Sequence, residues 1–279
     1  MRLSISNIAW EQPEEEEIAL ILKDLGVDAV DIAPGRYFPD QSTATKKEIT
    51  EVRELWCRRG CSIFGMQSLL FGVKGLNLFG SAQDRTSLTE HLRHSCRIAA
   101  GLGATRLVFG SPRNRDRTGL QDSEAEEIAF DFFSRLGNIA LNEGVTICIE
   151  ANPPSYGCNF ILTTPEALEF VQKIQHPAIK LQLDTGTILT NGERLSDLLL
   201  PSSPLASCIG HIHISEPGLM PPGDSQSRLE DLLPLIRRHF PNEIATIEML
   251  ATREESHLAS VERAIRWTTK YFTRQYCHP

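Results

Sequence analysis

Five ionisable side chains interrupt four otherwise apolar segments in the second half of the chain. Glu150, Asp184, His211, His213 and Glu248 lie in the segments CIEAN, QLDTG, HIHIS and TIEML. Consecutive segments are roughly 30 to 35 residues apart, which is the length of one strand–helix unit. An unpaired buried acid is costly, so ionisable groups in four such segments, three of them acids, indicate a shared chemical purpose.

Three carboxylates and an imidazole are a suitable ligand set for a divalent cation. Without a cation, converging carboxylates raise one another's pKa values. Three oxygen ligands and one nitrogen ligand suit Mn²⁺, Mg²⁺ or Co²⁺, and Zn²⁺ is also compatible. We therefore predict one divalent metal ion bound by Glu150, Asp184, His213 and Glu248. Both histidines qualify as the nitrogen ligand, but His213 is preferred because it lies nearer the strand end, with His211 one layer deeper.

A repeated pattern of helix, glycine and β-rich run predicts the elements that position these residues. Gly26, Gly60, Gly103 and Gly144 each precede a run rich in β-branched or aromatic residues. Glycine commonly follows the end of a helix, and such runs suit buried parallel strands. Four further strands are predicted at residues 3–8, 179–184, 208–215 and 243–250. Eight strands alternating with helices predict the α/β class and a single-domain (β/α)8 TIM barrel over residues 1–279.

Helix starts are predicted from capping residues. Pro13 precedes a run of glutamates, which favour a first helical turn. Thr164 is the predicted N-cap of a helix that continues with Pro165. Capping boxes are predicted for two further helices, pairing Ser123 with Glu126 and Thr252 with Glu255.

The composition is that of a globular protein with an acidic surface. Among 279 residues, 41% are hydrophobic, and the formal net charge is −8. Negative charge disfavours nucleic acid as a partner, and the absence of a long apolar run argues against a membrane span or a signal peptide. The seven cysteines form no CxxC pair, which favours reduced thiols and a cytoplasmic location. The sequence leaves open whether the chain forms a homo-oligomer.

The chain resembles the xylose isomerase-like TIM-barrel superfamily over nearly its whole length. The resemblance is strongest to the sugar-phosphate isomerase/epimerase branch, which includes ketose 3-epimerases, and rests on IEANP, LDTG, HIHISEP and IEM. It implies that the four predicted metal ligands end strands five to eight, and that Glu150 and Glu248 are the catalytic acid and base. The implied function is a divalent-metal-dependent sugar or sugar-phosphate isomerase/epimerase that removes a proton next to a carbonyl through a metal-stabilised enediolate.

Two positions depart from the ketose 3-epimerase pattern. Thr187 stands where those enzymes usually carry the histidine of a DxxH motif, and Leu219 stands where they carry an arginine. Both family residues normally contact oxygens of the substrate. The departures leave the predicted metal site unchanged, but they favour a substrate other than a free ketose.

Substrate-binding residues are predicted from polar and aromatic groups near the strand ends. In the segment GSPRNR, Arg113 and Arg115 suit a phosphate or carboxylate, or they pair with Asp116 or Asp122 in a solvated loop. Gln67 and Asn152 either bind substrate hydroxyls or fix loops. The full predicted set comprises Gln67, Arg113, Asn114, Arg115, Asn152, Tyr156, Thr187, His211 and Glu216.

Three other functions are considered beside the isomerase. A dehydratase acting on an inosose-like keto-polyol would begin with the same proton abstraction. A non-catalytic barrel that binds a metal or a sugar is a second alternative, because fold does not determine function. An endonuclease IV-like DNA repair enzyme is disfavoured, because its extra zinc-binding histidines are replaced by Gln67, Ser111 and Thr187. The predicted partner is a small-molecule sugar or sugar derivative.

Overall fold

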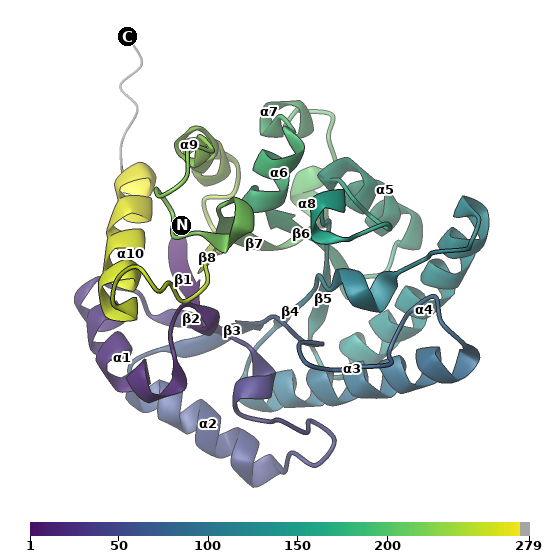
Figure 1. The fold of residues 1–279 in the computed structure, drawn as a ribbon, viewed down its shortest axis with the longest axis horizontal. Coiled ribbons are helices and arrows are strands. Elements are labelled where there is room, and N and C mark those ends of the chain that lie inside the picture. The colour runs from purple at the N-terminus through teal and green to yellow at the C-terminus, as the bar shows by residue number, and fades with distance from the viewer. Residues whose placement is uncertain (274–279) are drawn as a thin grey trace.

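Eight parallel strands form a closed barrel in the computed structural model, which describes residues 1–273. Neighbouring strands pair in chain order, and β1 pairs with β8 to close the sheet. Figure 1 shows the strands at the centre of the molecule with the helices around them. The strands are β1 (Arg2–Ser6), β2 (Ala29–Ile32), β3 (Ser62–Met66), β4 (Arg106–Phe109), β5 (Thr146–Glu150), β6 (Ile179–Asp184), β7 (Ile209–Ser215) and β8 (Ile244–Glu248). This confirms the predicted single-domain (β/α)8 TIM barrel.

The helices cover the outside of the barrel, and each of the eight strands is followed by at least one of them. The longer helices are α1 (Glu15–Asp24), α2 (Lys46–Arg58), α3 (Ala82–Leu102), α4 (Asp122–Asn142), α5 (Thr164–Ile174), α6 (Thr185–Asn191), α9 (Leu229–His239) and α10 (His257–Thr273). Two short helices, α7 (Leu195–Leu198) and α8 (Leu205–Cys208), lie between β6 and β7. The four predicted glycines follow α1 to α4 and have positive φ, as at Gly103, where φ is 82°.

The strands have an apolar outer face and a polar inner face. Ile147 and Ile149 of β5 belong to the apolar core. At the alternate positions, polar groups meet across the barrel. For example, Nε of Arg106 on β4 donates a hydrogen bond to the backbone oxygen of Gly210 on β7 at 2.6 Å. The side chains that alternate with the apolar core therefore place ionisable groups along the barrel axis.

The predicted helix starts are partly wrong. Helix α4 begins at Asp122 after Gln121, without the predicted Ser123 cap. The cap of α5 is Thr163, one residue earlier than predicted, and its Oγ1 accepts a hydrogen bond from the Glu166 amide. These differences of about one residue are within the usual uncertainty of helix ends.

The last helix begins later than its predicted capping box. Helix α10 starts at His257, whereas Thr252 accepts a hydrogen bond from the Glu254 amide within the preceding turn. Glu255 does not cap the helix because its carboxylate pairs with Arg263 of α10. By contrast, Pro13 lies in a 3₁₀ turn (Gln12–Glu14) that leads directly into α1, as the sequence predicted.

The described cysteines are all free thiols, and Cys277 lies outside the described residues. Within residues 1–273, no helix combines the length and the apolar character needed to cross a membrane.

Candidate metal centre

Four side chains from consecutive strands converge at the carboxyl ends of β5 to β8. Glu150, Asp184 and Glu248 are the last residues of β5, β6 and β8, and His213 lies in β7. Strand register places Asp184 directly beside His213. Each of the four offers one ligand atom, and these atoms all lie within 4.8 Å of one another. The parallel sheet thus brings together groups that are distant in the sequence.

The imidazole of His213 turns one nitrogen toward the acids of this group. Its Nδ1 lies 3.1 Å from Oε2 of Glu248 and 3.8 Å from Oε1 of Glu150. The ring is fully buried, whereas the side chains of Glu150 and Glu248 are 14% and 13% exposed. The two glutamate side chains are therefore accessible to a ligand, whereas the imidazole of His213 lies beneath them and is not.

Hydrogen bonds from neighbouring residues fix the carboxylate of Asp184. One carboxylate oxygen accepts a hydrogen bond from the Thr187 amide at 2.6 Å, so Asp184 also caps α6. The other oxygen accepts a hydrogen bond from Oγ of Ser215, also at 2.6 Å. The Ser215 hydroxyl further accepts from the Gly186 amide. Hydrogen bonds to a ligand carboxylate fix its orientation.

Glu150 lies over a glycine that leaves room for its carboxylate. A Cβ atom on Gly110 would lie 1.9 Å from Oε2 of Glu150, so only glycine fits there without displacing the acid. Asn152 donates from Nδ2 to the same Oε2 at 3.2 Å and to the Gly110 backbone oxygen at 2.9 Å. Nη1 of the buried Arg115 donates to the Glu150 backbone oxygen at 2.7 Å.

The crowding of buried carboxylates shifts the pKa values of Glu150, Asp184 and His213 upward. Burial, followed by the charges of Asp184 and Glu248, raises the pKa of Glu150 to about 8. Burial and Glu248 also raise the pKa of Asp184. Although burial opposes protonation of His213, the nearby Glu248 raises its pKa well above the ordinary value. A divalent cation would relieve this repulsion, so the donor set fits a metal of the type predicted from the sequence.

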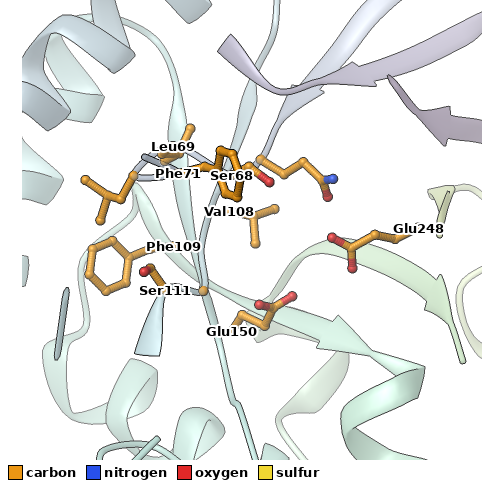
Figure 2. A pocket seen from close by; sticks show the side chains of 11 residues that line it. Ser68, Leu69, Phe71, Val108, Phe109, Ser111, Glu150 and Glu248 are labelled. Carbon is orange, nitrogen blue, oxygen red and sulfur yellow. The ribbon is translucent and has the colours of Figure 1, made fainter. Parts of the chain in front are cut away.

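A cavity of about 210 Å³ lies beside the two partly buried glutamates. Figure 2 shows Glu150 and Glu248 pointing into it from different sides. Its other lining residues are Gln67, Ser68, Leu69, Leu70, Phe71, Val108, Phe109, Gly110 and Ser111. Gln67 donates from Nε2 to Oγ of Ser6 at 2.6 Å, and its buried Oε1 has no partner within residues 1–273. The acids thus face a space suited to a small polar molecule.

Comparison with known families agrees with this arrangement. Residues 20–271 match the family described as xylose isomerase-like TIM barrel. The chain belongs to this family. No protein with a curated function matches the sequence significantly.

Solved structures of low sequence identity share this xylose isomerase-like fold. D-psicose 3-epimerase with D-tagatose, from Clostridium cellulolyticum H10, has a TM-score of 0.74 and 16% identity, covering 98% of this chain and 99% of the other. 3-keto-D-glucoside 4-epimerase, YcjR, from E. coli has a TM-score of 0.78 and 15% identity, covering 97% of this chain and 99% of the other. IOLI protein with a bound zinc atom has a TM-score of 0.77 and 14% identity, and the match covers 100% of both chains.

Below the four converging residues of this xylose isomerase-like barrel lies a second cluster that sequence reasoning missed. Asp31 of β2 is fully buried, and its Oδ2 lies 2.6 Å from Nε2 of His211 and 3.6 Å from Nε2 of His213. His211 is therefore turned to Asp31 and does not join the four converging groups. The only sequence signal was an acid within the apolar run AVDI.

The two arginines of the loop that follows β4 do not line the cavity. Arg113 is exposed, whereas Arg115 is buried against the Glu150 backbone. Asn114 accepts from Oγ of Ser111 and donates to the backbone oxygen of Leu76. Of this segment, only Gly110 and Ser111 border the cavity, so the structure does not bring the two arginines together with the acids.

The other predicted substrate-binding residues mainly contact the backbone. Thr187 donates from Oγ1 to the Ala151 oxygen at 3.0 Å. Tyr156 is 41% exposed, and its hydroxyl accepts from the Gly218 amide. Glu216 is buried and accepts hydrogen bonds from three residues of its own loop, namely Gly223, Ser225 and Ser227. These contacts fix the loops that surround the candidate metal centre.

Proposed function

We propose that the protein is a divalent-metal-dependent sugar isomerase or epimerase. The supporting observation is the convergence of Glu150, Asp184, His213 and Glu248 beside a cavity. Of these four residues, Glu150 and Glu248 line the cavity. Membership of the xylose isomerase-like family supports the proposal, and so do the structural neighbours that are sugar epimerases. The zinc atom in IOLI protein supports a divalent metal.

The four converging residues would hold the metal. When bound, a divalent cation supplies positive charge to the carbonyl and adjacent hydroxyl oxygens of a sugar. Gln67 borders the same cavity, and its unpartnered Oε1 would accept a hydrogen bond from a substrate hydroxyl. Asn152 keeps the Glu150 carboxylate in place through its hydrogen bond to Oε2.

Glu150 and Glu248 would move the proton. One carboxylate takes the proton from the carbon next to the carbonyl, and the C–H electron pair becomes the C=C bond of an enediolate. Return of a proton to the opposite face of the same carbon inverts it, which is epimerisation. Return to the neighbouring carbon, with transfer of the hydroxyl proton, moves the carbonyl, which is isomerisation. The two glutamates belong to different strands and flank one cavity, which suits epimerisation with a group on each face, whereas isomerisation needs only one of them.

Exchange of substrate hydrogen with deuterium from the solvent tests the proposal. The Mn²⁺-loaded protein is incubated in D₂O with ketoses, ketose phosphates, keto-inositols and small hydroxy-keto acids, and loss of the C–H signal is followed by NMR. We expect exchange that stops on chelation and in Glu248→Gln, but continues in Glu243→Gln, which changes an exposed acid just before β8.

The products of the same incubation separate the alternatives. Epimer or isomer formation supports the proposed function, whereas loss of water would identify a dehydratase. The absence of metal-dependent exchange with every compound would contradict an enzymatic role.

A further inference from the structure

A second and larger groove is continuous with the cavity at the metal centre. It measures about 960 Å³, against about 210 Å³ for the inner cavity. Ser68, Phe71 and Glu248 border both spaces. The groove extends from there over the loops that follow β1, β2 and β8, where Ile8, Arg36 and Leu250 line it. The candidate catalytic acid Glu248 therefore faces one connected space made of two unequal parts.

The two volumes suit a ligand larger than one sugar ring. Pockets for compact organic ligands span roughly 300 to 1,000 Å³. The inner cavity lies below that range and has room for a single small ring beside the glutamates. The outer groove lies near the upper limit, so it has ample room for a second ring attached to the first.

Phe71 stands at the junction of the two spaces with its ring in solvent. Its exposed fraction is 89%, the highest among the large hydrophobic side chains of residues 1–273. Figure 2 shows it next to Ser68 at the edge of the cavity that contains Glu150 and Glu248. An exposed aromatic ring at a cleft commonly marks a binding surface, and the C–H face of a sugar ring can stack on it.

The loop that presents Phe71 is fastened to the barrel. The backbone oxygen of Leu69 lies 2.9 Å from Nε2 of His91 and accepts a hydrogen bond from Nε2 of Gln41 at 3.3 Å. The Phe71 amide itself donates to the Ser68 oxygen at 3.1 Å. The exposure of the ring is thus a property of an anchored loop, which lowers the entropic cost of stacking a ligand on it.

The charges along the groove favour an uncharged second ring over a phosphate group. Three carboxylates border it, those of Glu11, Asp40 and Glu248, against the single guanidinium of Arg36. Arg36 is partly engaged, because its Nη1 donates to the Trp10 backbone oxygen. A phosphate would therefore meet net negative charge, whereas a neutral sugar finds acceptors for its hydroxyls.

We propose that the outer groove binds the second, uncharged sugar ring of a glycoside whose keto-sugar ring lies at the metal centre. This inference rests on the proposed function, which it deepens by naming the substrate class. Phe71 stacks on the second ring, and the carboxylates of Glu11 and Asp40 accept hydrogen bonds from its hydroxyls. A one-ring sugar fills the inner cavity alone and lacks these contacts.

Calorimetric titration with two matched ligands tests the proposal. The Mn²⁺-loaded protein is titrated with the methyl glycoside of 3-keto-glucose and with 3-keto-cellobiose, which adds one glucose ring. We expect the two-ring ligand to bind at least about tenfold more tightly. The Phe71→Ala variant should lose most of this ratio, whereas Phe71→Trp should keep it. The control Phe130→Ala, which removes another exposed phenylalanine on α4, should leave the ratio unchanged.

The outcomes separate this inference from the proposed function. Equal affinities for the two ligands, no measurable binding of either, or a ratio that survives in Phe71→Ala would overturn the second-ring site. Deuterium exchange is measured on the same samples. Preserved two-ring selectivity without any exchange would support the site and contradict the proposed chemistry.

Discussion

Nε2 of His213 lies 3.6 Å from Oδ2 of Asp31, on the side of the ring opposite the converging acids. The same oxygen lies 2.6 Å from Nε2 of His211, so one buried carboxylate lies beside two imidazole rings. Only His211 is hydrogen-bonded to Asp31, and within residues 1–273 Nε2 of His213 has no hydrogen-bond partner, so Asp31 acts on His213 as a nearby negative charge. That charge favours a proton on Nε2 of His213, which leaves Nδ1 unprotonated and facing the proposed metal.

Replacing Asp31 with asparagine should weaken metal binding. The Asp31→Asn variant keeps the shape of the side chain but removes the charge that orients His213, and loss of such an outer partner typically costs about 10–100-fold in metal affinity. Titration of the metal-free protein with Mn²⁺ measures the effect. The control Asp28→Asn removes an exposed acid shortly before β2 and should leave the affinity unchanged. Equal affinities in wild type and Asp31→Asn would show that His213 needs no such partner.

Removing a proposed metal ligand should remove the metal itself. Elemental analysis of the wild-type protein is expected to find one divalent ion per chain. Asp184→Ala and His213→Ala each delete one of the four converging groups, and both should lose most of the metal. His211→Asn serves as a comparison, because His211 lies outside that group and should retain more of it. Full occupancy in both alanine variants would refute the proposed centre.

Much of the barrel could be predicted because its signals are local. Each glycine that ends a helix, such as Gly103, adopts the left-handed conformation for which side chains are unfavourable, and the following strand is a continuous apolar run. The strand-end residues Glu150, Asp184 and Glu248 interrupt such runs, so their convergence followed from the barrel topology alone.

The rest of the site depends on distances across the barrel that local patterns do not contain. Asp31 acts on histidines 180 residues or more away in the chain, and its own segment resembles an ordinary strand. Gly110 matters only because Glu150 lies above it. The arginine loop shows the same limit, because the sequence could not reveal that Arg115 turns inward to the Glu150 backbone.

A methyl group at Gly110 should displace Glu150 and impair the metal centre. Gly110 has no positive φ, so Gly110→Ala introduces little backbone strain, but the new Cβ would lie 1.9 Å from Oε2 of Glu150. We expect metal affinity to fall at least about tenfold, as for other losses of ligand geometry. Gly35→Ala is the matched control, since nothing lies within 4 Å of its Cβ. Unchanged Mn²⁺ titrations in Gly110→Ala would mean that Glu150 is not a ligand.

The metal-free protein should lose stability as the pH rises. The pKa of Glu150 is raised to about 8, against 4.5 for an ordinary glutamate, because of burial and the charges of Asp184 and Glu248. Between these two values the folded protein keeps a proton that the unfolded chain releases. Stability is therefore full below about pH 4.5 and is lost as the pH approaches 8. The raised pKa of His213 acts in the same direction above its ordinary value of 6.5.

Thermal unfolding in the presence of a chelator measures this effect. The Tm of the wild-type protein should be lower at pH 8 than at pH 6, and Glu150→Gln should show a clearly smaller difference because its amide cannot ionise. Glu243→Gln, which changes an exposed acid, should behave like wild type. Adding Mn²⁺ should restore more stability at pH 8 than at pH 6, because binding requires the carboxylates in their ionised form. The same decline in wild type and Glu150→Gln would exclude Glu150 as its source and would remove the electrostatic reason for placing a cation there.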